Sequence, residues 1–174
     1  MKLKNNVALR AVEPEDIDIL YQWENDMELW VVSETLTPFS KHQLKQYIKT
    51  MNLDIYQSKE LRLMIETEEE NPQLVGMIDL FDFDPYHSRA GVGIMVKKEF
   101  EGKGCASAGL QLFIDYCFNN LGIHQLYSSI IISNKRSINL FEAKGFECSG
   151  VRKQWRKQGR EYVDEAFYQL VNNG

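Results

Sequence analysis

Residues 96–106 read Val-Lys-Lys-Glu-Phe-Glu-Gly-Lys-Gly-Cys-Ala and stand between a predicted strand and a long predicted helix. Glycines at 102 and 104 allow the backbone N–H groups of this turn to converge on one point. The helix that follows adds its unpaired N–H groups and the positive end of its dipole. Such a turn is able to hold a pyrophosphate with backbone groups alone. The alternative is a glycine turn that only packs the helix against the strand.

Two other phosphate-binding motifs do not fit this stretch. A P-loop requires G-x-x-x-x-G-K-[ST], but Cys105 and Ala106 follow Gly104. A dinucleotide-binding turn requires G-x-G-x-x-G, but Ser107 occupies the place of the third glycine. The turn therefore belongs to neither class.

Outward from the turn, hydrophobic periodicity predicts the remaining elements. Four helices are expected: one from Glu13, one from Ser40 with an S-x-x-Q capping box, one over 106–121, and one from Asn134 to about Lys144. Seven strands are expected over 7–11, 61–66, 73–83, 91–96, 126–132, 148–156 and 162–171. This order predicts one α/β (α+β) domain over residues 1–174, with a mixed, largely antiparallel sheet of about six to seven strands and about four flanking helices.

Composition limits the partners of the chain. The 174 residues carry a formal net charge of −5, which argues against nucleic acid and tolerates cationic substrates. No apolar run reaches the roughly 20 residues of a membrane span, and the first six residues are too polar for a signal peptide. The three cysteines and three histidines show no metal-binding spacing. We therefore expect a cytoplasmic protein with no metal site and no membrane or nucleic-acid partner.

Two motifs together resemble the GNAT acetyltransferases. The acetyl-CoA loop of that family reads [QR]-x-x-G-x-[GA], and this chain has Glu-Gly-Lys-Gly-Cys-Ala at 101–106. The family also has an N-x-x-S helix start that closes in Gly-Phe, and Asn134 to Phe146 match it. The order of elements matches along essentially the whole chain, and the resemblance is strongest to the ribosomal-protein N-terminal and spermidine N-acetyltransferases.

The resemblance implies acetyl-CoA as co-substrate and a role for each matching residue. A backbone amide near Ile94 or Met95 would face the thioester oxygen, and Phe141 would lie near the sulfur. The residues implied for the cofactor are Met95, Val96 and Lys97 beside the pantetheine arm, Gly102, Lys103, Gly104, Cys105, Ala106 and Ser107 around the pyrophosphate, and Asn134, Ser137 and Phe141 on the later helix.

The chain departs from the family pattern at three places. Glu101 replaces the usual Gln or Arg, and a carboxylate there is unfavourable beside a pyrophosphate unless it turns outward to solvent. Phe141 replaces the tyrosine that protonates the leaving thiolate in many relatives. Gly91 and Val92 stand where many relatives carry a glutamate base. Asp79, on the neighbouring strand, is the candidate base through a water, or else it only ends a strand or orders a turn.

The acceptor side is less defined by the sequence. Trp23, Glu28 and Glu34 lie in the first helical region, where they indicate either a pocket for a cationic amine or a solvated helix whose tryptophans fill the core. The basic residues from Arg152 to Arg160 are interpreted as a charged surface on the last hairpin, with an acidic partner as the alternative.

We therefore expect an N-acetyltransferase that transfers acetyl from acetyl-CoA directly to a primary amine in a ternary complex. The acceptor would be a small cationic amine, such as a polyamine, or a protein N-terminus, and the enzyme is a possible homodimer. The alternative is a catalytically weak acetyl-CoA-binding module.

Overall fold

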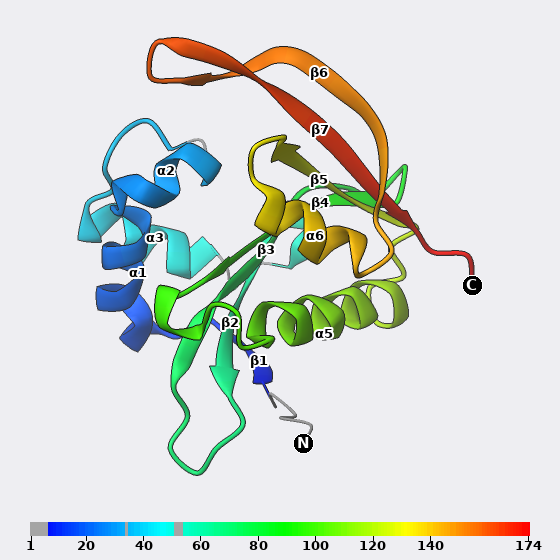
Figure 1. Ribbon diagram of the computed structural model, residues 1–174. Coiled ribbons are helices and arrows are strands. Elements are labelled where there is room, and N and C mark those ends of the chain that lie inside the picture. The colour runs from blue at the N-terminus through cyan, green and yellow to red at the C-terminus, as the bar shows by residue number, and fades with distance from the viewer. Residues whose placement is uncertain (1–6, 34, 51–53) are drawn as a thin grey trace.

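A seven-stranded sheet with helices on both faces forms the body of the molecule (Figure 1). The computed structural model describes residues 7–33, 35–50 and 54–174, so the first six residues and Glu34 lie outside the description. The elements in chain order are β1 (Val7–Ala11), the 3-10 helix η1 (Pro14–Asp16), α1 (Ile17–Glu24), α2 (Met27–Ser33), α3 (Lys41–Thr50), α4 (Ile55–Ser58), β2 (Leu61–Thr67), β3 (Leu74–Asp84), β4 (Arg89–Val96), the 3-10 helix η2 (Lys98–Phe100), α5 (Cys105–Asn119), β5 (Gln125–Ile131), α6 (Lys135–Glu142), β6 (Glu147–Gln158) and β7 (Glu161–Val171).

This order confirms the predicted α/β class, the predicted strands and the predicted helices. Two short helices, α2 and α4, were not predicted. They span only 7 and 4 residues, which is too short to display a full hydrophobic period. The capping box at the start of α3 is confirmed, because Ser40 Oγ accepts from the Gln43 N–H at 3.1 Å and Gln43 Oε1 accepts from the Ser40 N–H at 2.8 Å.

The sheet has the strand order β1-β2-β3-β4-β5-β7-β6, and its neighbours are antiparallel except for β4 and β5. These two parallel strands pair only over Arg89–Gly91 and Gln125–Tyr127. Beyond that point β4 continues to Val96 and β5 to Ile131 without further pairing between them. The backbone groups that border this split are left for another partner.

Each face of the sheet has its own hydrophobic cluster. On one face, Ile78, Val92 and Leu126 pack with Phe113 of α5 and Phe141 of α6. On the opposite face, which we call the α1 face, α1 and α3 contribute Leu20, Trp23, Leu44 and Ile48, which pack on Met64 and Met77. This second cluster extends to Met95 of β4 and includes no described residue of β5, β6 or β7. Helices therefore cover half of the α1 face and leave the other half open.

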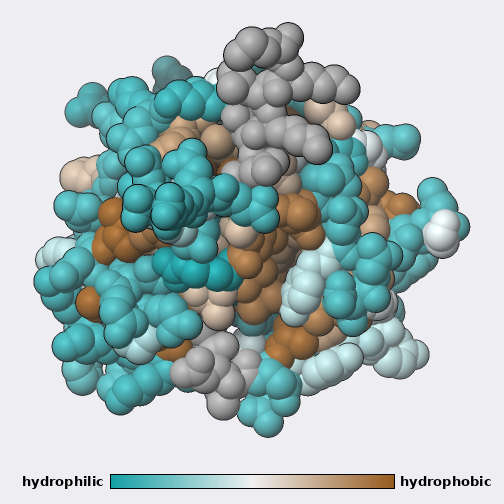
Figure 2. Space-filling view, turned by 90° about the horizontal axis from the view of Figure 1, so that it is seen from below, coloured by the Kyte–Doolittle hydropathy of each residue, from teal (hydrophilic) through white to brown (hydrophobic). Residues whose placement is uncertain are grey.

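The surface of the molecule carries both hydrophobic and hydrophilic residues. Figure 2 shows one face on which hydrophobic residues gather at the centre and hydrophilic residues surround them. In the part of the chain that the structure describes, no helix is long and apolar enough to cross a membrane. The β6–β7 hairpin forms the outer strands of the sheet and extends toward the side that carries α2 (Figure 1).

Candidate active site

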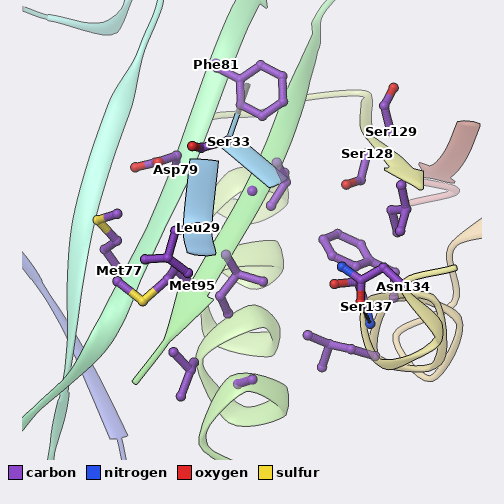
Figure 3. Close-up of a pocket in the computed structure, with 18 of the residues that line it drawn as sticks. Leu29, Ser33, Met77, Asp79, Phe81, Met95, Ser128, Ser129, Asn134 and Ser137 are labelled. Carbon is purple, nitrogen blue, oxygen red and sulfur yellow. Dashed lines mark hydrogen bonds between the residues drawn. The ribbon is translucent and has the colours of Figure 1, made fainter. Parts of the chain in front are cut away.

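A cleft of ≈ 1640 Å³ joins the β4–β5 split to the open half of the α1 face. Figure 3 shows Asp79 and Phe81 of β3 on one side, and Ser128 and Ser129 of β5 with Asn134 on the other. Leu29 and Ser33 of α2 lie in front of the strands. The predicted site residues that line the cleft are Trp23, Asp79, Met95, Val96, Gly102, Gly104, Ala106, Ser107, Asn134, Ser137 and Phe141.

Four other members of the predicted set lie outside this lining: Glu28, Lys97, Lys103 and Cys105. Glu28 is exposed on α2. The Lys97 ammonium lies over the Trp23 ring, and the Lys103 ammonium lies 5.4 Å from the centre of the Phe100 ring. Burial raises the pKa of the Cys105 thiol, so the position at the helix start does not acidify it.

The glycine turn has the backbone geometry of an anion cradle. Gly102 and Gly104 have φ values of +70° and +82°, in the left-handed region that favours glycine. The first hydrogen bond of α5 runs from the Ala108 N–H to the Gly104 carbonyl, at 3.0 Å. The N–H groups of Cys105, Ala106 and Ser107 therefore precede the hydrogen-bond ladder of the helix, which is where helices bind phosphate. The donors present fit a pyrophosphate.

The sequence predicts that Glu101 is unfavourable beside a pyrophosphate unless it turns outward to solvent, and the structure shows its carboxylate paired with a cation. Its two carboxylate oxygens pair with Arg136 of α6, with Nη1–Oε1 at 2.6 Å and Nη2–Oε2 at 2.7 Å. This bidentate pair joins the turn to the start of α6 and neutralises the carboxylate. The departure from the family pattern at Glu101 is thus matched by a cation on the facing helix.

The edge of β4 presents alternate N–H groups to the split. The Lys97 N–H donates to the Val75 carbonyl of β3 at 2.8 Å. Because N–H groups alternate sides along a strand that pairs antiparallel with its neighbour, Met95 also directs its N–H toward β3. Ile94 and Val96 therefore direct theirs toward the split. Of the two predicted oxyanion donors, Ile94 has the suitable direction.

The start of α6 brings Asn134, Ser137 and Phe141 into the cleft. Asn134 caps the helix as predicted, since its side-chain oxygen accepts from the Ser137 N–H at 3.2 Å. The Phe141 ring is 3% exposed and lies edge-on to Phe146, with ring centres 4.9 Å apart. Ser128 of β5 also lines this region and lies on the same side of the cleft as Asn134 in Figure 3. Neither Phe141 nor Phe146 is able to donate a proton.

Asp79 lies in the middle of β3 rather than at a strand end or in a turn, so that alternative was wrong. Its oxygens accept from Arg62 of β2, at 2.6 Å from Nε and 2.8 Å from Nη2. The remaining arm of Arg62 pairs with Glu24 of α1, and the guanidinium lies 5.2 Å from the centre of the Tyr47 ring. The role of Asp79 as a base stays a prediction, and its carboxylate is held by a cation.

The missing glutamate at position 91 has a steric reason. A Cβ placed on Gly91 would overlap the Phe81 ring, which lies over this part of β4. The same ring lies within van der Waals distance of a Cβ placed on Gly93. Phe81 therefore occupies the space in which a side chain at 91 would project from the α1 face.

An aromatic floor extends from Phe81 across the open half of the α1 face. The rings of Phe81 and Tyr127 meet edge-on at 6.1 Å, and those of Tyr127 and Phe167 stack at 5.3 Å. The Arg152 guanidinium lies 5.4 Å from the Phe167 ring centre and 4.9 Å from that of Trp155. We use the name aromatic floor for Phe81, Tyr127, Phe167 and Trp155, all of which line the cleft.

Two arginines of the last hairpin belong to this site, so their interpretation as a charged surface was wrong. Arg156 is 9% exposed and donates to Glu165, which is 1% exposed, at 3.2 Å. Arg152 lines the cleft and donates to the Ser129 hydroxyl of β5 at 3.0 Å. The sequence did not reveal them because residues 152 and 156 reach this face through an irregularity in the pairing of β6 with β7.

The comparisons with known proteins agree with this geometry. The family model described as an acetyltransferase (GNAT) domain matches residues 6–147. The spermidine N(1)-acetyltransferase of Vibrio cholerae is 26% identical over 151 residues, which cover 85% of this chain and 83% of that protein. The uncharacterised N-acetyltransferase p20 of Bacillus licheniformis is 26% identical over 166 residues, covering 95% and 92%. The crystal structure of spermidine N-acetyltransferase from Vibrio cholerae in complex with CoA and spermine shares the fold, with a TM-score of 0.85 at 23% identity over 95% of each chain.

Proposed function

This chain belongs to the GNAT acetyltransferase family, and we propose that it transfers an acetyl group from acetyl-CoA to a primary amine in a ternary complex. The observation that carries the proposal is the continuity of the cleft, in which an amide-built turn and an open acceptor face meet at the β4–β5 split. The acceptor class is a small cationic amine, such as a polyamine, or a protein N-terminus. The domain would comprise residues 1–174 and act in the cytoplasm.

Backbone groups would hold the cofactor. The N–H groups at the start of α5 would face the pyrophosphate, and the open edge of β4 would offer hydrogen bonds to an extended pantetheine arm. Acetyl-CoA supplies an acetyl thioester, which is activated for attack by an amine. The Ile94 N–H is directed toward the split, where it would stabilise negative charge that develops on the thioester oxygen.

Asp79 would orient the acceptor. A carboxylate has about four lone-pair positions, and Arg62 uses one on each oxygen of Asp79. The remaining positions are able to accept hydrogen bonds from an ammonium group or from a water that removes its proton. The neutral amine nitrogen then bonds to the acetyl carbon, the carbon–sulfur bond breaks, and the nitrogen loses its second proton to water as the leaving thiolate takes one up.

The absence of a tyrosine at position 141 lowers the expected rate without preventing the reaction. The leaving thiol resembles a cysteine thiol, with a pKa of about 8.5, so its thiolate departs tolerably well at neutral pH and water is able to protonate it. A positioned general acid would add roughly 10²–10⁴ in rate.

Release of free thiol from acetyl-CoA, measured with a panel of amines and with acetylated products identified by mass spectrometry, tests the proposal. Amine-dependent release supports it. The second candidate, a catalytically weak acetyl-CoA-binding module, is favoured by Phe141 and by the ring that covers Gly91. If calorimetry shows that acetyl-CoA binds, and no amine in the panel causes release of thiol from it, the second candidate is selected and the first is refuted.

A further inference from the structure

Arg152 is held inside the cleft in a fixed position. From β6 it reaches across β7 to the Ser129 hydroxyl of β5, and its guanidinium lies over the rings of Phe167 and Trp155. Its side chain remains 39% exposed. Among the described residues, its hydrogen bond to Ser129 and its ion pair to Glu165, at 3.5 Å, both involve Nη2.

This geometry leaves the Nε and Nη1 side of the Arg152 guanidinium available to a ligand. A guanidinium has five N–H donors in a rigid fork, and those on Nε and Nη1 have no acceptor in the described part of the protein. The fork matches the two oxygens of a carboxylate. Because the rings and Ser129 already restrict the side chain, little conformational entropy remains to be lost on binding.

A role in surface charge alone does not explain this position. Lys153, the next residue, supplies a cation that is 78% exposed, pairs with Asp164 at 2.8 Å and lies outside the cleft lining. The chain thus presents one basic side chain of β6 to solvent and the preceding one to the acceptor face.

The opposite side of the aromatic floor carries carboxylates. Asp79 shares Arg62 with Glu24, so that one cation faces two carboxylates there. Asp82 also lines the cleft from β3. An ammonium group is favoured on this side, and a carboxylate is favoured beside Arg152. A polyamine that extends across the floor would instead place a second cation near a guanidinium.

We propose that the acceptor is an amine that also carries a carboxylate, of the size of an amino acid or a dipeptide, and that Arg152 binds this carboxylate. The inference rests on the proposed function, transfer to a primary amine, and specifies an amino-carboxylate as that amine in place of a polyamine or a protein N-terminus. It makes Arg152 a specificity-determining residue for the transfer.

Matched acceptors test the inference. The twenty amino acids, their α-amides and spermidine are assayed for thiol release with the wild type, Arg152→Met, Arg152→Lys and the control Lys153→Met. We expect an amino acid to be the best acceptor. We expect Arg152→Met to lower the ratio of kcat/KM for that acid to kcat/KM for its amide by about 10- to 100-fold, as for a lost hydrogen bond to a charged group. Arg152→Lys should lower it less, and Lys153→Met should leave it unchanged.

The outcomes separate the two claims. Two results overturn the inference and leave the acetyltransferase assignment in place. In the first, kcat/KM for the amides or for spermidine equals or exceeds kcat/KM for the acids. In the second, Arg152→Met leaves the ratio of acid to amide kcat/KM unchanged. If no amine is turned over, the proposed function fails. In that event, calorimetric binding of the acids and amides to the CoA-loaded wild type and Arg152→Met decides the inference separately, and equal affinities would overturn it.

Discussion

The two ends of the cleft are built from different chemical groups. At the end proposed for the cofactor, which we call the cofactor end, the donors are backbone N–H groups of a glycine turn, a helix start and an unpaired strand edge. At the end proposed for the amine, which we call the acceptor end, the polar and aromatic groups belong to side chains that converge from β2, β3, β5, β6, β7 and α1. A backbone-built site survives changes of side chain, whereas a site built from side chains changes with each substitution. The first end is therefore suited to a constant cofactor and the second to a variable acceptor.

The largest expected effect comes from breaking the acceptor end at Arg62. Replacing Arg62 by Met leaves Asp79 and Glu24 without their shared cation, which should lower the free energy of unfolding by about 3 kcal/mol or more. Denaturant unfolding followed by circular dichroism measures this loss. The control Arg89→Met removes a pair that is half exposed, with Asp84 at 3.3 Å, and should cost less than about 1 kcal/mol. Equal small losses would show that the Arg62 cluster does not organise this end.

The second largest effect is expected at the cofactor end, where a substitution of Gly104 should weaken acetyl-CoA binding. A side chain is strained at φ +82°, and an aspartate there adds a negative charge beside the proposed pyrophosphate position. We expect Gly104→Asp to weaken acetyl-CoA binding by on the order of 100-fold, or about 2.7 kcal/mol, in titration calorimetry. Gly159→Asp makes the same change at φ +61° in the β6–β7 turn and should leave the affinity unchanged. Equal acetyl-CoA affinities for Gly104→Asp and wild type would remove the turn from the site.

These two ends also differ in how well the sequence predicted them. The turn at Gly102 and Gly104 and the cap at Asn134 were predicted because each depends on residues that are adjacent in the chain. Arg62 and Arg152 were missed because their contacts depend on strand register and on an irregularity in β6. The fold was predicted nearly completely, since hydrophobic periods are local, apart from two helices too short to show one.

Phe141→Tyr tests whether residue 141 lies beside the leaving thiolate, where the cofactor end meets the acceptor end. Within an acetyltransferase cleft, a new phenol at this position would donate to the developing thiolate. It should raise kcat by about tenfold, which is less than the roughly 10²–10⁴ of a fully positioned general acid, with little change in KM for acetyl-CoA. Steady-state rates and melting temperature are measured together. Phe146→Tyr places a hydroxyl on the neighbouring buried ring, outside the cleft lining, and should only lower stability, by roughly 1–3 kcal/mol. A Phe141→Tyr variant that is destabilised and no faster would make Phe141 a core residue only.

Asn134→Ala tests whether one residue serves both the fold and the cofactor end. Loss of its hydrogen bond to the Ser137 N–H should cost about 0.5–2 kcal/mol of stability, and acetyl-CoA binding should weaken a few-fold, or by about 1 kcal/mol. Asp54 caps the short helix α4 through the N–H groups of Tyr56 and Gln57 and lies outside the cleft lining. Asp54→Ala should therefore lower stability alone. If Asn134→Ala behaves in the same way, its role is limited to the cap.

Glu101→Gln should change acetyl-CoA affinity the least, and it should strengthen binding where Gly104→Asp and Asn134→Ala weaken it. The ion pair with Arg136 is about one third exposed on the Glu101 side and two thirds on the Arg136 side, so its loss should cost at most about 1 kcal/mol of stability. The substitution removes a negative charge from the turn and releases Arg136 to interact with a phosphate, so acetyl-CoA should bind about two- to fivefold more tightly at low salt. This gain should shrink as salt screens the exposed charges. Glu99→Gln, which changes an exposed carboxylate outside the cleft lining, is the matched control and should leave the affinity unchanged. Calorimetry at two salt concentrations measures the affinity for acetyl-CoA. If Glu101→Gln binds acetyl-CoA more weakly than the wild type, the ion pair with Arg136 positions α6 against the turn. Even the backbone-built end would then depend on a side-chain contact.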